Sequence, residues 1–426
     1  MSSPALERET IEVLTGPDAG ELLRLALIGS GRAGRPGRHA SPDPGGETIT
    51  EWRAEVDSVH HRPGAGVSVG YRVSYGVAGV QVSEYLVAST AEVPDGPGVA
   101  VLQDGVRTVR VWRRAQDPVL PGLEQALDPA AVGEWLRESG VGAGDPARTQ
   151  LLSYRPTRRA VIRATVGEAT YYLKVLPERR ARRLERRHRL LDAPVHRAPK
   201  VLARPLPTIL VIAAAPGRPL AEAIAAARSR PADLPDPLDV VAWLDELPAG
   251  VLELGARSSW VDRIDFHAAA ARGTLPGEAA RIEVIESGVQ EVLAERPPPP
   301  TVPTHGDYYE ANIFTAAGEV SGVIDLDSLG PGAREDDLAT LLGHLAVLRS
   351  LAPTVYPHGD ELVLEWFEVL ARTCDPASLA ARVAGVVLSL VAGTGPDQAE
   401  QRLVTAEDWL SRAHHLAADV PQVRRS

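Results

Sequence analysis

The stretch "THGDYYEANIFTAAGEVSGVIDLDSLG", residues 304–330, gathers short polar side chains whose types suit metal and proton chemistry. Asp307 is followed by Asn312 five residues later, and Asp325 comes directly after an apolar run. Carboxylate and amide oxygens are the ligands that magnesium prefers, and a carboxylate can also accept the proton of a hydroxyl group. These side chains could serve one reaction centre, provided that the fold brings them together.

The segments on either side of the turn "AAGE" predict the element that would do so. "NIFT" and "VSGVID" are short and apolar, and the turn contains a glycine, so we expect a β-hairpin. Pairing of Thr315 with Val320 would place Asn312 opposite Val323. Asp325, two residues further on, would then be a diagonal neighbour of Asn312, about 7–8 Å away. Each polar residue taken alone could be a turn former or a strand cap, but their combined spacing favours a common site.

A lysine inside a predicted strand completes a set suited to phosphoryl transfer. That reaction needs a divalent metal, a carboxylate that receives the hydroxyl proton, and a cation on the phosphates. Lys174 lies between apolar neighbours in "TYYLKVL", where a charge is costly unless it faces a cleft or a partner. Of 45 Lys and Arg residues, only Lys174 and Lys200 are lysines. We interpret Lys200 as a surface or turn residue and Lys174 as the phosphate-binding cation, the alternative being a lysine on a solvated edge strand.

The composition bounds the class of protein. With 426 residues, of which 44% are hydrophobic, the chain can bury a substantial core and should form two or three domains. A net charge of −11 argues against nucleic acid as a partner, because nucleic-acid-binding proteins usually carry a basic face. The single Cys374 excludes an intrachain disulfide. No apolar run reaches the length of a membrane span and the first residues lack the profile of a secretion signal, so we expect no membrane association and a cytoplasmic location.

The order of the predicted elements favours an α+β fold. Residues 31–47 are rich in Gly and Pro and predict a mobile loop, and alternating segments after it make residues 1–145 a β-rich N-terminal region. A helix from Asp128 leads to a second group of strands within residues 146–215, and the pattern over residues 216–426 is mostly helical. Strands followed by helices predict a small sheet lobe and a larger helical lobe.

Two further patterns concern the N-terminal region. "HHRPGAGVSVGYRVSYG" and "SYRPTRRAVIRATVG" share an Arg-Pro pair and an alternating run that ends at a glycine. In the first copy Val87 stands where the second has Lys174, so the pair is either a duplication or two ordinary hairpins. "GSGRAG", residues 29–34, matches a dinucleotide-binding fingerprint by coincidence, because the Pro-rich segment that follows cannot open a helix.

The motifs "HGDYYEAN", residues 305–312, and "VIDLD", residues 323–327, resemble the catalytic loop and metal-binding segment of the aminoglycoside phosphotransferase and choline kinase-like family. The resemblance covers roughly residues 146–426. It implies a protein-kinase-like fold with two lobes. It also implies transfer of the γ-phosphate of ATP, with Mg²⁺, to a hydroxyl group of a small molecule.

The resemblance implies a role for each residue of the two motifs. Asp307 would be the catalytic base or would orient the hydroxyl group. Asn312 and Asp325 would hold magnesium. His305 would brace the loop without acid-base work of its own, and Asp327 would support the metal site or cap a turn.

The resemblance also implies a nucleotide site. Lys174 would contact the α- and β-phosphates. Its partner on the following helix would be Glu178 or Glu185, and Glu185 is preferred because it lies among helical neighbours and away from Pro177. Adenine would bind backbone groups from Ala213 to Ala215, in the hinge between the lobes. No glycine-rich loop precedes Lys174, so either Arg158 or Arg159 would help to hold phosphate or the turn "RPTRR" is simply solvated.

The acceptor is defined less closely. In this family the C-terminal helices build the acceptor pocket. Here they carry acidic residues that would attract a cationic amino sugar or aminoglycoside, unless they only form solvated faces: Glu361, Glu365, Glu368, Asp397, Glu400, Glu407 and Asp408. The N-terminal region resembles the extra domain of maltokinase and glucosamine kinase relatives, which favours a sugar or amino sugar. The alternative is an inactive pseudokinase that acts as a binding scaffold.

Overall fold

A computed structural model describes residues 4–29, 49–62, 64, 66–141, 147–227 and 234–418. The loop predicted at residues 31–47 and the "GSGRAG" motif after Gly29 lie outside these residues. The chain divides into two compact units, Met1–Glu185 with Val201–Ala214, and Arg186–Lys200 with Ala215–Ser426. Within the described ranges, no helix combines the length and the apolar character needed to cross a membrane.

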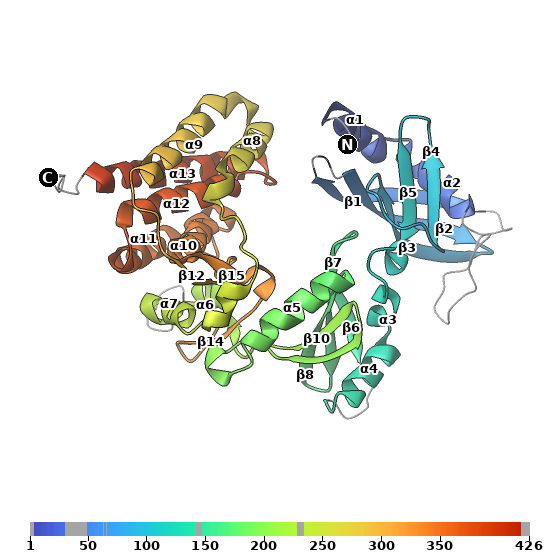
Figure 1. The fold of residues 1–426 in the computed structure, drawn as a ribbon. Coiled ribbons are helices and arrows are strands. Elements are labelled where there is room, and N and C mark those ends of the chain that lie inside the picture. The colour runs from blue at the N-terminus through green and yellow to red at the C-terminus, as the bar shows by residue number, and fades with distance from the viewer. Residues whose placement is uncertain are drawn as a thin grey trace. The chain divides into compact units, whose positions relative to one another are not determined.

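The first unit begins with an antiparallel sheet that two helices cover (Figure 1). The helices are α1 (Pro4–Thr15) and α2 (Ala19–Gly29). The strands pair in the order β1-β2-β3-β5-β4 and are β1 (Thr50–Arg62), β2 (Gly66–Val77), β3 (Val80–Ser89), β4 (Val99–Gln103) and β5 (Thr108–Arg113). Alternation along β2 turns Tyr71 and Val73 toward the helices, where they share a buried core with Leu14 and Leu23.

The second sheet of this unit repeats the topology of the first. It follows the helices α3 (Leu123–Leu127) and α4 (Pro129–Glu138). Its strands pair in the order β6-β7-β8-β10-β9 and are β6 (Arg148–Arg155), β7 (Arg159–Val166), β8 (Ala169–Val175), β9 (Val201–Leu206) and β10 (Ile209–Ala213). Leu86 and Leu173 pack toward the preceding helices of their own sheets, so Val87 and Lys174, one residue later, face the opposite sides. A duplication predicts this shared strand order.

The second unit is mainly helical, and α5 (Glu178–Leu190) connects the first unit to it. Its helices are α6 (Leu220–Ala226), α7 (Pro237–Asp245), α8 (Ile264–Thr274), α9 (Ala279–Ala294), α10 (Arg334–Leu351), α11 (Gly359–Leu370), α12 (Pro376–Ser389) and α13 (Pro396–Ala418). Its short strands are β11 (Arg218–Pro219), β12 (Thr301–Thr304), β13 (Ile313–Ala316), β14 (Glu319–Val323) and β15 (Gly330–Ala333). Helix α12 is almost entirely buried and packs on α9, α10 and α13 (Figure 1). Sheets in the first part and helices in the second confirm the predicted α+β class.

Candidate active site

Strands β13 and β14 form the hairpin predicted around "AAGE". Thr315 pairs with Val320, as expected. The expectation that Asn312 lies opposite Val323 is wrong, because the register shifts by one residue between the second and third pairs and Ile313 takes that place. A bulge of this kind inserts one extra residue into one strand of the hairpin and moves everything beyond it.

The two predicted metal ligands, Asn312 and Asp325, lie at the same end of the hairpin. The N–H of Ile324 donates to the carbonyl oxygen of Asn312 (2.9 Å), which extends the pairing by one residue. Asp325 is the next residue and has a left-handed backbone, with φ 62° and ψ 56°. That conformation is uncommon for a residue other than glycine, although Asp tolerates it better than most, and such residues cluster at functional sites.

His305 connects the loop of Asp307 to this end of the hairpin. The ring is fully buried. The N–H of Asp307 donates to Nδ1 (3.3 Å), so Nε2 carries the proton and donates to the carbonyl oxygen of Ile324 (2.9 Å). Since the N–H of Ile324 already binds Asn312, one imidazole holds the loop and the hairpin end together. These are the contacts that a bracing residue would make.

Asn312 closes the loop through its side chain. Its Nδ2 donates to the carbonyl oxygen of Asp307 (2.9 Å), and its own N–H donates to the carbonyl oxygen of Tyr309 (2.9 Å). Because the amide nitrogen is engaged, Oδ1 is the atom that Asn312 can offer to a metal. A short 3₁₀ turn, Leu326–Ser328, begins directly after Asp325 and contains Asp327.

Asp337, at the start of α10, fixes the other end of the loop. Its carboxylate accepts the N–H groups of His305 (2.8 Å) and Gly306 (2.7 Å), and the residue is 1% exposed. Burial raises the pKa of Asp337 to about 7, although the two backbone hydrogen bonds act in the opposite direction. Gly306 has φ +76°, and a Cβ there would lie 2.7 Å from the carbonyl oxygen of Ser328, so the loop requires glycine.

Aromatic packing on α7 supports the loop from beneath. Tyr308 is fully buried and stacks on Trp243, with ring centroids 5.6 Å apart. The hydroxyl of Tyr308 donates to the carbonyl oxygen of Val240 (2.5 Å), and Nε1 of Trp243 donates to that of His196 (2.5 Å). The ring of His305 meets both aromatic rings edge-on. This support could not be predicted from the sequence alone, although the two tyrosines that follow Asp307 are a sign of it.

Glu310 is a buried acid of the same loop that the sequence analysis did not single out. It is 7% exposed, and its Oε2 has no hydrogen-bond partner among the described residues. Burial raises the pKa of Glu310 from 4.5 to about 7. Because the folded state binds the proton more tightly than the unfolded state, this group favours folding most below pH 4.5. Its contribution is lost as the pH rises toward 7.

We therefore expect Glu310→Gln, which removes the charge and keeps the shape, to be more stable than the natural protein at pH 8. The gain should be at most about 3 kcal/mol and should vanish near pH 4, where the natural side chain is protonated. Urea unfolding at both pH values in metal-free buffer measures the difference. Glu319→Gln, on the exposed surface of β14, is the matched control. A less stable E310Q variant at pH 8 would contradict the expectation.

The residues predicted to bind the nucleotide lie mainly in the first unit. Lys174 is half-buried on β8 between the buried Leu173 and Val175. Glu185 lies on α5 and forms an ion pair with Arg204 (2.8 Å), so its pairing with Lys174 stays a prediction. Ala213 ends β10, and the chain enters the second unit at Ala215.

The residues predicted for the site thus fall into two groups, one in each unit. Within the second unit, His305 contacts the backbone of Asp307 and Ile324, and Asn312 contacts the backbone of Asp307. Asp325 is the residue after Ile324. Lys174 belongs to the first unit, and its meeting with them stays a prediction. Within the described residues, no group of three or more His, Cys, Asp or Glu side chains is arranged for a metal ion.

Comparison with known proteins agrees with the motifs. Residues 157–365 match the model of the phosphotransferase enzyme family, which confirms the resemblance for this part of the chain. No curated protein matches the chain.

Similar solved structures include a thermostable mutant of aminoglycoside phosphotransferase APH(4)-Ia, with 15% identity, a TM-score of 0.44, and coverage of 67% of this chain and 98% of that one. Macrolide 2'-phosphotransferase MphH from Brachybacterium faecium has 17% identity and a TM-score of 0.39, with coverage of 70% and 99%. A choline/ethanolamine kinase family protein from Mesorhizobium loti has 15% identity and a TM-score of 0.42, with coverage of 63% and 92%. Similarities at this level do not assign a substrate.

Proposed function

We propose that the protein is a small-molecule kinase that transfers the γ-phosphate of ATP, with Mg²⁺, to a hydroxyl group. The observation that carries the proposal is the set of hydrogen bonds through which His305 and Asn312 lock Asp307 and the end of the hairpin into one piece. An amide and a carboxylate fit Mg²⁺, which takes one or two protein ligands and completes its shell with water and phosphate oxygens. Magnesium neutralises charge on the phosphates when it is bound.

Each residue has one role in this proposal. Asp307 accepts the proton of the acceptor hydroxyl, and Asn312 and Asp325 hold the metal, with Asp327 in support. Lys174 binds the α- and β-phosphates and pairs with Glu185. Backbone groups from Ala213 to Ala215 bind adenine. Residues 146–215 then form the nucleotide lobe and residues 216–426 the acceptor lobe of a cytoplasmic enzyme. Residues 1–145 form an added region of the kind found in maltokinase relatives.

A screen of ATP consumption tests the proposal. The purified chain is incubated with ATP and Mg²⁺ and with sugars, amino sugars, aminoglycosides or choline-like alcohols as acceptors. We expect phosphorylation of at least one class and none when EDTA removes the metal. A pseudokinase scaffold would instead consume no ATP with any acceptor and would show no metal-dependent stabilisation by a nucleotide.

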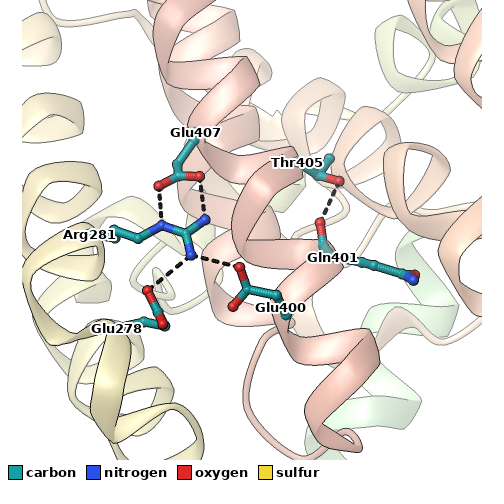
Figure 2. A network of polar contacts seen from close by, with 6 residues as sticks. All are labelled: Glu278, Arg281, Glu400, Gln401, Thr405 and Glu407. Atoms are coloured by element: carbon teal, nitrogen blue, oxygen red, sulfur yellow. Dashed lines mark hydrogen bonds and ion pairs between the residues drawn. The ribbon is translucent and has the colours of Figure 1, made fainter.

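The acidic residues of the C-terminal helices include two kinds, those that pair with Arg281 and those that line a pocket. Figure 2 shows the guanidinium of Arg281, on α9, between Glu278, Glu400 and Glu407. The contacts are 3.0 Å to Glu278, 2.6 Å to Glu400 and 2.6 Å to Glu407, so these carboxylates already have a counterion. Glu400 and Glu407 connect α13 to α9, and none of the three carboxylates is a residue that would attract a cationic acceptor.

Glu361 and Glu365 are of the second kind. They line a pocket of about 300 Å³ together with Tyr356 and apolar side chains such as Ile224 and Leu362. Burial raises the pKa of the Tyr356 hydroxyl, and the charges of Glu310 and Glu222 add to the effect. An apolar wall with two carboxylates suits an amino sugar or aminoglycoside, whose amines would pair with the acids.

We expect Glu361→Gln combined with Glu365→Gln to raise the KM for an amino-sugar acceptor about tenfold, because each lost carboxylate removes a charge-assisted hydrogen bond in a partly solvated site. The KM for ATP should not change. Steady-state kinetics with both substrates measures the effect, with Glu283→Gln and Glu291→Gln on the exposed face of α9 as the matched pair. An unchanged KM for every amino-bearing acceptor would place the acceptor elsewhere.

A further inference from the structure

The first sheet carries a groove on the face that its helices do not cover. The groove has a volume of about 390 Å³ and lies over β1, β2 and β3. Register pairs Arg53 with Ser74 and Ser74 with Ser83 in one row, and places Arg72 beside Tyr85 in the next. Arg114, directly after β5, completes the wall. The repeated topology makes this the face that corresponds to the Lys174 side of the second sheet.

Arg114 is the central cation of the sheet groove. Its guanidinium lies 4.7 Å from the centroid of the Tyr85 ring, in the geometry of a cation–π contact. The side chain is half-buried, and within the described part of the chain no carboxylate forms an ion pair with it. Burial lowers the pKa of Arg114, although Tyr85, Tyr154 and the charge of Asp57 act in the opposite direction. A buried cation of this kind is stabilised by an anion.

The other charges of the groove are positive on balance. Arg72 pairs with Asp57, whereas no described acid pairs with Arg53. Glu84 is neutralised by Arg113 (2.7 Å), which leaves Glu55 and Asp57 against three guanidinium groups. The chain as a whole has a net charge of −11, so a groove with a net positive charge is a local exception. A positive groove on an acidic protein favours the binding of an anion.

We propose that the sheet groove binds a small molecule that carries a phosphate ester. Guanidinium groups match the oxygens of a phosphate dianion in pairs, and the hydroxyls of Ser74 and Ser83 can donate further hydrogen bonds to it. The volume leaves room for a sugar-sized body beside the phosphate. The proposal does not depend on kinase activity, since the groove lies on the first sheet, whereas Lys174 belongs to the second sheet and Asp307, Asn312 and Asp325 belong to the second unit.

Calorimetric titration of the full chain tests the proposal, with glucose 6-phosphate, inorganic phosphate and glucose as probes. We expect the sugar phosphate to bind with an affinity that depends on Arg53 and Arg114, and any binding of glucose to be independent of these two residues. Comparison of the affinities for inorganic phosphate and for glucose 6-phosphate shows whether the groove prefers free phosphate or a phosphate ester. Arg114→Gln and Arg53→Gln should each weaken binding about tenfold or more, because each removes a charge-assisted hydrogen bond. Arg137→Gln, an exposed arginine on α4, should not.

Hydrogen exchange separates this site from the candidate active site. Binding in the groove should slow the exchange of backbone amides in residues 50–89 in the natural protein and not in R114Q. The melting temperature of each variant without ligand reports its folding, and Arg114→Lys, which keeps the charge, covers the case in which the glutamine variant does not fold. Absence of sugar-phosphate binding would overturn the proposal. Equal binding by the natural protein, R53Q and R114Q would do the same, as would protection confined to residues 300–330.

Discussion

Asp307→Asn should lower kcat by roughly 10²–10⁴-fold while leaving the fold and the affinity for ATP nearly unchanged, because the variant cannot accept the hydroxyl proton. Two hydrogen bonds hold this residue in place through its backbone, the N–H to His305 and the carbonyl oxygen to Asn312. A change of side chain leaves both intact. The loss should therefore appear in the chemical step rather than in stability.

Steady-state kinetics with the best acceptor of the screen measures this effect, and thermal unfolding checks the fold. Asp265→Asn, on the exposed surface of α8, makes the same chemical change away from the site and should keep full activity. A loss smaller than tenfold in D307N would exclude Asp307 as the proton acceptor.

Asp325→Asn should abolish the magnesium-dependent part of nucleotide binding. Asparagine tolerates the left-handed backbone that Asp325 adopts, whereas alanine would add strain, so the asparagine variant isolates the loss of the charged ligand. In the natural protein a nonhydrolysable ATP analogue should raise the melting temperature more with MgCl₂ than with EDTA. In D325N the two shifts should be equal, and kcat/KM should fall by roughly 100-fold or more.

Thermal shift with and without metal is the direct measurement for this variant. Asp327→Asn is the informative neighbour, because Asp327 lies in the turn that follows and should have a weaker effect. Retention of the full magnesium-dependent shift in D325N would remove Asp325 from the metal site and leave the assignment of Asp307 untouched.

The sequence predicted the parts of the site that depend on local chemistry. The hairpin follows from two apolar segments around a glycine turn, and its pairing of Thr315 with Val320 is confirmed. The register beyond that pair could not be predicted. A β-bulge adds one residue to one strand, and the alternation of apolar and polar residues in the sequence does not show where this happens. In the structure Ile324 pairs with Asn312 through its backbone, and Asp325 is the next residue. The prediction had placed Asp325 two residues beyond the partner of Asn312, on the same face of the hairpin.

Long-range partners were beyond the reach of the sequence. Asp337 lies far along the chain from the loop it holds, and nothing in the spacing shows that its carboxylate accepts the N–H groups of His305 and Gly306. The burial of Glu310 depends on packing in the same way. Helices α1 and α2 were also missed, because the strand pattern after residue 48 dominated the interpretation of the N-terminal region. Their apolar faces are short and become meaningful only against the sheet.

The repeated strand order has a consequence for how such a chain could arise and be dissected. The last strand of the first sheet ends at Arg113, and the first strand of the second sheet begins at Arg148. In the part of the chain that the structure describes, neither sheet contains a strand from the other. The segment that encodes the first sheet could therefore be gained or lost in evolution without a change in the strand connections of the second sheet. Removal of the first sheet would expose Tyr154 of the second sheet, whose hydroxyl oxygen lies 3.4 Å from Nε1 of Trp112 in the first sheet.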